Sequence, residues 1–138
     1  MTEVFETRVR ESFARQGFMR TLGAELVEVG EGATAIRLPR GEPVAQQHGY
    51  MHAGALIAVV DTACGYAALT VAPPDSEVLT SELKINLLSP PRARPSSRGG
   101  AWSARAAGSR CQGDVYDADD PSRHLATMLG TVVVVPSS

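Results

Sequence analysis

The chain has 138 residues and a mass of 14.6 kDa, which suits one domain and leaves no room for separate cofactor and substrate domains. Its 43% hydrophobic and 20% charged residues are typical of a globular protein and exclude wholesale disorder. The 13 basic and 15 acidic residues give a net charge of -2, so no excess of positive charge predicts binding to nucleic acid or to an anionic membrane. We therefore expect a single domain over residues 1–138, with neither nucleic acid nor membrane as a partner.

The N-terminal segment mixes acidic residues and arginines with apolar residues at helical spacing. These apolar residues are Val4, Phe5, Val9 and Phe13. The pattern predicts an amphipathic helix of the mature protein, because a signal peptide needs a continuous apolar stretch. Cys64 and Cys111 are too few for a disulfide framework and lack metal-binding spacing, so we expect reduced thiols and a cytoplasmic location, with a disulfide between them left open.

Two short runs of alternating apolar residues, 24–29 and 33–38, flank the triplet Gly30-Glu31-Gly32, which predicts a tight hairpin. Gly30, Gly32 and Ala35 also fit the glycine pattern of a dinucleotide site. That motif must open a helix, whereas the residues after Gly32 continue as a strand. We therefore expect no nucleotide site here.

The segment 53–72 is almost uncharged and, at about 20 residues, is long enough to cross a membrane. Ala and Gly make up most of it, and Asp61 near its centre is costly in lipid. The segment is therefore predicted as the buried core helix of a globular protein, ended by Pro73 and Pro74.

The segment 78–88 alternates and predicts a half-buried strand. Its apolar face would hold Leu79, Leu83, Ile85 and Leu87, and its polar face Thr80, Glu82, Lys84 and Asn86. Residues 113–117 and 126–135 are predicted as two further strands. A helix, a hairpin, a buried helix and then antiparallel strands is the order of an α+β fold, with one antiparallel sheet wrapped around one long central helix.

Asp61 calls for a functional explanation, because a lone carboxylate in an apolar helix is destabilising unless it is paired or faces a cleft. A bond to a neighbouring hydroxyl such as that of Thr62 is the structural alternative. At the start of the same helix, the N–H groups near Ala53 and Gly54 lack partners within the helix and lie at the positive end of its dipole. Such groups can polarise a carbonyl oxygen.

The other motifs of the sequence give weaker indications of function. His48 and His52 have the spacing of zinc ligands on one helical turn, but further ligands are missing, so no metal is expected. The chain has no Gly-x-Ser-x-Gly segment for a serine hydrolase. Cys64 has no activating neighbour in the sequence and is interpreted as a core residue.

Asp61 lies eight residues after Ala53. This is roughly 12 Å along a helix, too far for both to act on one carbonyl group. A two-fold dimer with antiparallel helices would place Asp61 of one subunit beside the helix start of the other and create two equivalent sites. We therefore expect an obligate homodimer, and leave open whether dimers pair into a homotetramer.

These residues form a known pattern: QQHGYMHAG over 46–54, then Asp61, then LTSELKINLLSP over 79–90. The pattern resembles the PaaI-like (phenylacetic-acid-degradation type) acyl-CoA thioesterases of the hotdog fold. Their signature has an Asn, a short loop, His-Gly-Gly, and an Asp nine residues after the His, a spacing that His52 and Asp61 keep. The match covers residues 20–90 and resumes in the last predicted strand.

The resemblance implies hydrolysis of an acyl- or aryl-CoA thioester without metal or organic cofactor. Asp61 would be the general base on water, or the nucleophile, at the thioester carbon. The N–H of Ala53, where the family usually has Gly, would polarise the thioester oxygen. Gln46, where the family has Asn, would bind the carbonyl or the water.

The remaining assignments of the resemblance concern positioning and the CoA arm. His52 would orient the turn and the helix start, and Thr80 would hold water or support the Asp from the neighbouring strand. Gly54, Ser89 and Pro90 would contact the substrate, with the CoA arm leaving along the strand exit.

Residues 91–111 depart from the family pattern, in which a strand pair stands here. The segment has no alternation and few β-branched residues, and five arginines without one acidic residue. It is interpreted as an irregular basic loop, as a strand of poor sequence, or as the product of an altered reading frame. If the residues are authentic, the arginines can meet the CoA phosphates, although a solvated loop is the simpler role.

Two other functions are consistent with the sequence. One is a hotdog dehydratase or hydratase of acyl thioesters, which needs a catalytic His and a carboxylate in a different frame that no segment matches. The other is a non-catalytic acyl-CoA-binding protein, which the atypical segment favours. The acyl group itself stays open, because loops and two chains shape the pocket.

Overall fold

The computed structural model describes residues 2–93, 101–107 and 111–138. The elements follow one another along the chain in this order: α1 (Thr2–Ala14), α2 (Gly17–Leu22), β1 (Glu25–Gly30), β2 (Ala33–Pro39), the 3-10 turn η1 (Glu42–Val44), α3 (Ala53–Val71), β3 (Ser76–Leu87), β4 (Ala101–Ala107), β5 (Cys111–Asp117) and β6 (His124–Pro136). The predicted N-terminal helix is thus two helices. Val4 is exposed and only Val9 is fully buried, against Tyr66 and Leu69 of α3, so the predicted apolar face is partly wrong.

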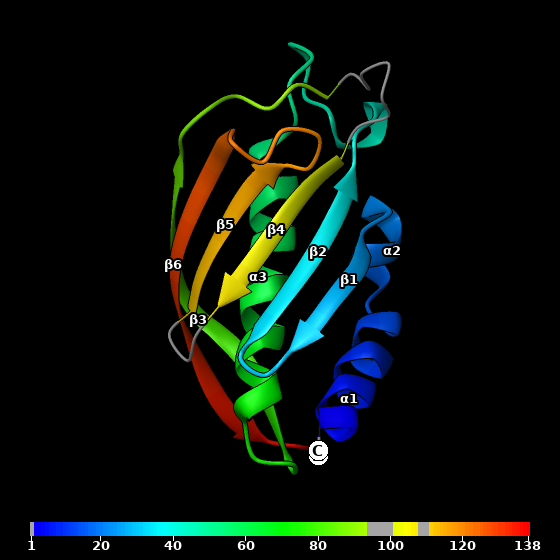
Figure 1. Ribbon diagram of the computed structural model, residues 1–138, viewed down its shortest axis with the longest axis vertical. Coiled ribbons are helices and arrows are strands. Elements are labelled where there is room, and N and C mark those ends of the chain that lie inside the picture. Colours follow the sequence, from blue (N-terminus) through cyan, green and yellow to red (C-terminus); the bar gives the residue numbers. More distant parts are fainter. Residues whose placement is uncertain (1, 94–100, 108–110) are drawn as a thin grey trace.

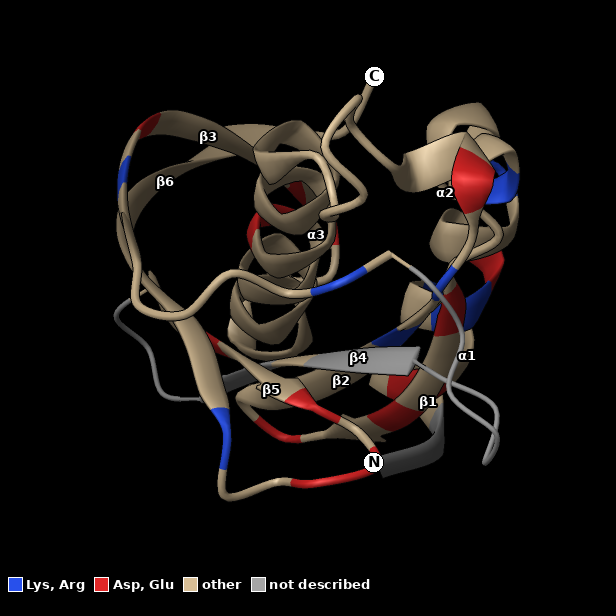
Figure 2. Cartoon of the chain, turned by 90° about the horizontal axis from the view of Figure 1, so that it is seen from above, with Lys and Arg blue, Asp and Glu red and all other residues tan. Residues whose placement is uncertain are grey.

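The six strands form one antiparallel sheet in the order β1-β2-β4-β5-β6-β3. The sheet curves around α3, with α1 and α2 beside β1 (Figures 1 and 2). This arrangement confirms the predicted α+β fold with one long central helix. A helix apolar on nearly all sides is stable in water only when other elements enclose it, which the curved sheet does.

The helix α3 is long and apolar enough to cross a membrane by length and composition. In the fold, most of it packs inside the sheet: Val59, Val60 and Ala63 are fully buried. Thr34 of β2 donates a hydrogen bond to the Ala63 carbonyl at 2.7 Å. The prediction of a core helix is therefore confirmed.

The hairpin β1–β2 forms as predicted, and Gly32 in its turn has φ 70, a left-handed backbone conformation that glycine adopts without strain. The Gly32 N–H donates to Thr70 Oγ1 at 2.7 Å, which fixes the turn on the last residues of α3. Gly30 and Gly32 therefore belong to a strand–turn–strand unit and open no helix, as the sequence predicted.

The strand β3 differs from its prediction. It lies at the edge of the sheet, and a bulge between Thr80 and Glu82 interrupts its pairing with β6. An added residue in one strand reverses which side chains face the core, so Thr80 reaches α3 although it was predicted on the polar face. Leu79, Leu83 and Leu87 are exposed, because no further strand or helix of the described residues covers this edge. A half-buried strand with one continuous apolar face is therefore wrong.

The atypical segment contains the central strand β4, between β2 and β5. The structure agrees with the second of the three interpretations, since residues 101–107 form a strand although their sequence has low β-propensity. Ladder hydrogen bonds come from the backbone, so neighbouring strands on both sides can hold a sequence of low β-propensity. Residues 94–100 and 108–110 lie outside the described residues. Of the five arginines of this segment, Arg92 is the one whose side chain is described. The altered reading frame stays a hypothesis.

Candidate active site

The start of α3 is built by His52, whose backbone is extended at φ -63 and ψ 130. Its Nδ1 accepts a hydrogen bond from the Gly54 N–H at 2.8 Å, and its carbonyl accepts from the Ala55 N–H at 3.0 Å. A Cβ on Gly54 would lie 2.9 Å from His52 Nδ1, so this cap requires glycine. Within the described residues, the Ala53 N–H is thus the one of these three donors that makes no hydrogen bond.

The loop before α3 is held by the Gln46 side chain. Its Oε1 accepts hydrogen bonds from the backbone N–H of His48 at 2.5 Å and of Tyr50 at 3.2 Å. The carbonyl half of the amide is therefore occupied, while its NH₂ donates to no group in the described part of the chain. Gln46 keeps an amide donor beside the start of α3.

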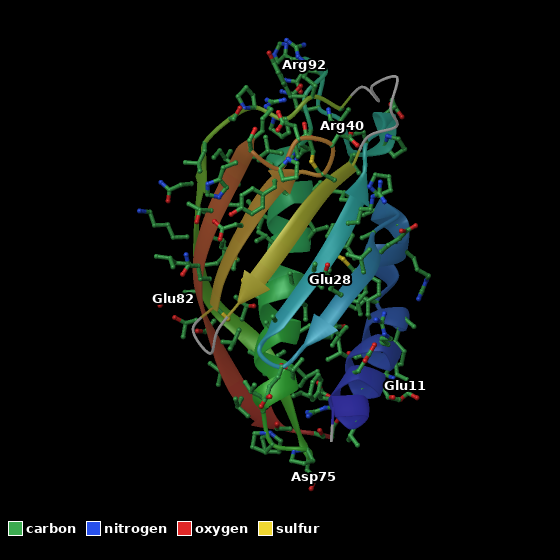
Figure 3. All side chains as sticks on the ribbon, in the orientation of Figure 1. Glu11, Glu28, Arg40, Asp75, Glu82 and Arg92 are labelled. Carbon is green, nitrogen blue, oxygen red and sulfur yellow. The ribbon has the colours of Figure 1, made fainter. Side chains whose placement is uncertain are left out.

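A cavity of about 350 Å³, which we name the helix-start cavity, adjoins these donors. Gln46, Ala53, Ser89 and Pro90 line it, together with apolar side chains of the loop, α3 and the end of β3. Arg123 donates to Ser89 Oγ at 3.3 Å. Arg40 and Arg92 lie at the same end of the molecule (Figure 3), and the Arg92 guanidinium is 5.4 Å from the centroid of the Tyr50 ring.

Asp61 lines a second cavity of about 310 Å³ between α1, α3 and β3, which we name the Asp61 cavity. Thr80 Oγ1 donates to Asp61 Oδ1 at 2.7 Å. The hydroxyl partner of the carboxylate is therefore Thr80 of β3 and not Thr62 of its own helix, the structural alternative raised from the sequence. Asp61 is half-buried, and the Thr80 bond leaves Oδ2 available to other groups.

The structure divides the predicted site residues into two groups. Gln46, Ala53, Ser89 and Pro90 line the helix-start cavity, with His52 and Gly54 forming the cap beside it. Asp61 and Thr80 line the Asp61 cavity, and no residue lines both cavities. One chain therefore does not bring the carboxylate to the helix start, as the length of the helix predicted.

The two cysteines are free thiols, both buried, so no disulfide joins them. Burial raises the pKa of Cys64 to about 12, and the neighbouring Cys111 and Asp61 act in the same direction. A thiol that stays protonated at neutral pH is a poor nucleophile, which supports the interpretation of Cys64 as a core residue. In the described part of the chain, no three His, Cys, Asp or Glu side chains are grouped as metal ligands.

Three residues of the Asp61 cavity were missed from the sequence: Ser12, Gln16 and Tyr66. Tyr66 lies five residues after Asp61 on α3, and its apolar surroundings gave no signal. Ser12 lies in α1 and Gln16 between α1 and α2, and no local spacing connects them to a carboxylate so far along the chain. Only the packing of α1 against α3 brings them there.

Residues 48–115 match the sequence profile of the thioesterase superfamily. A thioesterase family protein from Silicibacter pomeroyi is 33% identical in sequence and similar in structure, with a TM-score of 0.84 over 96% of this chain and 99% of that one. The E. coli PaaI protein from the phenylacetic acid degradation operon is 17% identical, with a TM-score of 0.81 over 99% of this chain and 97% of that one, which is a likeness of fold.

The 1,4-dihydroxy-2-naphthoyl-CoA hydrolase of Listeria monocytogenes is 31% identical over 77 residues, or 56% of this chain and 63% of that protein. A relative from Saccharolobus solfataricus is 33% identical over 69 residues, or 50% of this chain and 49% of that protein. The matches thus span less than two thirds of both curated relatives. The profile and the near full-length likeness to the Silicibacter pomeroyi protein nevertheless agree on the family, and they confirm the resemblance seen in the sequence. The chain belongs to the thioesterase superfamily and has the PaaI-like hotdog fold.

Proposed function

We propose that this chain, as a single domain over residues 1–138, hydrolyses an acyl- or aryl-CoA thioester to the free acid and CoA. The observation that carries the proposal is the pair of complementary half-sites. One holds a carboxylate fixed by Thr80, and the other holds an uncommitted N–H at a helix start beside an amide donor. A base and an oxyanion-binding donor are the two groups that thioester hydrolysis needs.

In this proposal Asp61 Oδ2 removes a proton from water, and the water oxygen attacks the thioester carbon. The negative charge that develops on the carbonyl oxygen is stabilised by the Ala53 N–H and the Gln46 NH₂. The C–S bond then breaks, and the sulfur of CoA leaves with the proton. Direct attack by Asp61 is the alternative. Heavy-oxygen label in the Asp61 carboxylate after a single turnover in labelled water would demonstrate it, because only a covalent intermediate that water attacks at the Asp61 carbonyl carbon places label there.

The two half-sites meet in a homodimer in which α3 of one subunit lies antiparallel to α3 of the other. The face of α3 that carries Asp61 supports this: Ala58, Thr62 and Gly65 on it are small and only half-buried. The edge strand β3 adds exposed leucines next to that face. Small residues allow close approach of two helices, and an exposed apolar edge is stabilised by burial against a second copy. His52 and Gly54 shape the donor side, and Ser89 and Pro90 line the exit for the CoA arm.

The expected cytoplasmic location belongs to the same proposal, which leaves open whether the dimers pair into tetramers. The name of the Listeria monocytogenes relative, a 1,4-dihydroxy-2-naphthoyl-CoA hydrolase, supports CoA thioesters as the substrate class. It does not select the acyl group for this chain.

A thiol-release assay over short, long and aromatic acyl-CoAs tests the proposal, with Asp61→Asn as the key variant. Asn keeps the size of the side chain and its bond with Thr80 but is no base, so we expect the rate to fall by about 100-fold or more. Wild-type hydrolysis by Asp61→Asn would refute the mechanism. Hydration of an enoyl-CoA without thiol release would select the dehydratase, and binding of acyl-CoA without turnover would select the non-catalytic protein.

A further inference from the structure

The Asp61 cavity is lined in part by a cluster of three polar side chains: Ser12 of α1, Gln16 of the break before α2, and Tyr66 of α3. Gln16 Nε2 donates to the Tyr66 hydroxyl at 2.7 Å, and Ser12 Oγ lies 3.0 Å from the same hydroxyl. All three residues line the cavity together with Asp61. The Tyr66 ring is buried and packs against the Phe13 ring at 6.2 Å between centroids, so the hydroxyl has a fixed position.

The hydroxyl groups of this cluster have one more proton than the hydrogen bonds within the cluster use. Ser12 and Tyr66 each carry one O–H, but the contact between their oxygens uses only one of these two protons. Gln16 adds a donor and no acceptor to the Tyr66 oxygen. No further side-chain hydrogen bond of Ser12, Gln16 or Tyr66 occurs within the described residues. One O–H donor at the end of the cavity therefore remains for a bound molecule.

The path from Asp61 to this donor is open. Tyr66 lies five residues beyond Asp61, about 7.5 Å along the helix. Gly65 lies between them, one turn after Asp61, and a Cβ there would already be 3.9 Å from Val78 of β3. Asp61, Gly65 and Tyr66 line the same cavity, and a larger side chain in place of Gly65 would take up space in it between the carboxylate and the Tyr66 hydroxyl.

The charges along the cavity restrict what can enter it. Asp61 and Glu77 are the charged residues that line the cavity in the described part of the chain, and both are acidic. Leu69, Val78 and Leu79 supply apolar walls. A neutral group is compatible with these surroundings, whereas a carboxylate would meet like charge without a basic partner.

Resting on the hydrolysis proposed above, we propose that Ser12, Gln16 and Tyr66 determine acyl specificity. They select a short acyl group whose far end carries a neutral hydrogen-bond acceptor, such as a keto or hydroxyl oxygen. The thioester carbon lies at Asp61, the chain or ring runs over Gly65, and the terminal oxygen accepts the spare O–H. A purely alkyl group of the same length leaves this donor without a partner, and a terminal carboxylate is repelled.

The test compares three acyl-CoAs of equal chain length in a thiol-release assay: hexanoyl-CoA, its derivative with a keto group on the penultimate carbon, and adipoyl-CoA. For the wild type, we expect kcat/KM to be about tenfold higher for the keto compound than for hexanoyl-CoA, and lowest for adipoyl-CoA. In the double variant Ser12→Ala/Tyr66→Phe, which removes both hydroxyls and keeps the ring, this preference disappears while hexanoyl-CoA is still hydrolysed.

The matched control is Ser122→Ala/Tyr116→Phe, the same two substitutions at residues outside both cavities, which leaves the preference at its wild-type value. Gln16→Met reports on the cluster if the double variant does not fold, and is expected to weaken the preference. Two results overturn this inference alone. One is that the double variant and Gln16→Met hydrolyse all three substrates and keep the wild-type preference for the keto compound. The other is that the wild type favours adipoyl-CoA. Absence of thiol release from every acyl-CoA overturns the proposed function and the inference with it.

Discussion

The Thr80 hydroxyl donates to Asp61 Oδ1 at 2.7 Å and thereby fixes the carboxylate at the wall of the Asp61 cavity. We predict that Thr80→Val, which keeps the shape of the side chain, lowers kcat about tenfold, because a mispositioned base loses much of its advantage. Thr80→Ser keeps the hydroxyl and is expected to retain most of the activity. Steady-state thiol release measures both.

The control for this prediction is Thr131→Val. Thr131 Oγ1 donates to Glu82 Oε1 at 2.8 Å, so the same kind of bond is removed from a different carboxylate. Glu82 extends away from the body of the molecule (Figure 3), and neither residue lines the Asp61 cavity. A Thr80→Val protein as active as Thr131→Val would contradict the role of Thr80.

Single residues were predictable where their chemistry is local. Asp61 stood out because a carboxylate in an apolar helix is costly, and His52 because it precedes the helix start. The partner of Asp61 was not predictable from alternation, because the bulge in β3 decides that Thr80 faces α3. The family resemblance pointed to Thr80 nevertheless.

Two strand ends are tied by the Arg40–Asp117 ion pair. Arg40 follows β2 and Asp117 ends β5, with Nη2 and Oδ2 2.7 Å apart and both side chains less than a tenth exposed, at 8% and 7%. Breaking a buried ion pair deprives the remaining charge of its closest counter-charge. We therefore predict that Arg40→Met lowers the free energy of unfolding by about 3 kcal/mol at neutral pH, as measured by urea denaturation.

The control here is Arg123→Met. Arg123 approaches the same Asp117 oxygen at 3.6 Å, but its side chain is 44% exposed, so solvent screens the interaction. A loss of less than about 1 kcal/mol is expected for this variant. Equal losses for the two arginines would contradict the distinction between the buried and the exposed pair.

The same pair has a pH dependence. Burial of Asp117 opposes its ionisation, but hydrogen bonds from the Asp119 backbone and from Arg40, together with the Arg40 charge, outweigh burial and hold its pKa below the usual value. The folded protein thus binds this proton more weakly than the unfolded chain. The contribution to stability is present above about pH 4 and is lost as the pH falls through the folded pKa, so the difference between wild type and Arg40→Met should shrink there.

Elements with strong periodicity or turn signals were predicted well, and β4 was not. The residues of the core helix and of the hairpin predict these elements by themselves, through their apolar pattern and their turn glycines. The sequence of β4 has no such pattern, since its strand conformation comes from backbone pairing with β2 and β5 on both sides. The division of the N-terminal segment into two helices was not predicted, because its apolar residues keep helical spacing up to Phe13 and no proline follows Ala14 before α2.

At the scale of the whole molecule, complementation tests whether two chains share one site. Ala53→Pro removes the uncommitted N–H, and proline is tolerated at the first helical position. The extended backbone of His52, at φ -63 and ψ 130, is also what a residue before proline requires. We predict that Ala53→Pro and Asp61→Ala are each inactive as homodimers.

A co-refolded equimolar mixture of the two variants should regain about a quarter of the wild-type activity. Half of the dimers are then heterodimers, and each of these has one intact site of two. The measurement is thiol release, with the dimer content determined by light scattering. A mixture as inactive as its components, in heterodimers shown to form, would place both groups of each site in one chain.

The sequence by itself determined the α+β class, the central helix, the hairpin and the identity of the carboxylate and the helix-start donor, because these depend on local periodicity, turn residues and the cost of a charge in an apolar segment. Only the tertiary structure decided that β4 completes the sheet, that Thr80 rather than Thr62 holds Asp61, and that the packing of the N-terminal segment against α3 brings Ser12 and Gln16 to Tyr66. Each of these depends on contacts between residues far apart in the chain, which no local pattern records.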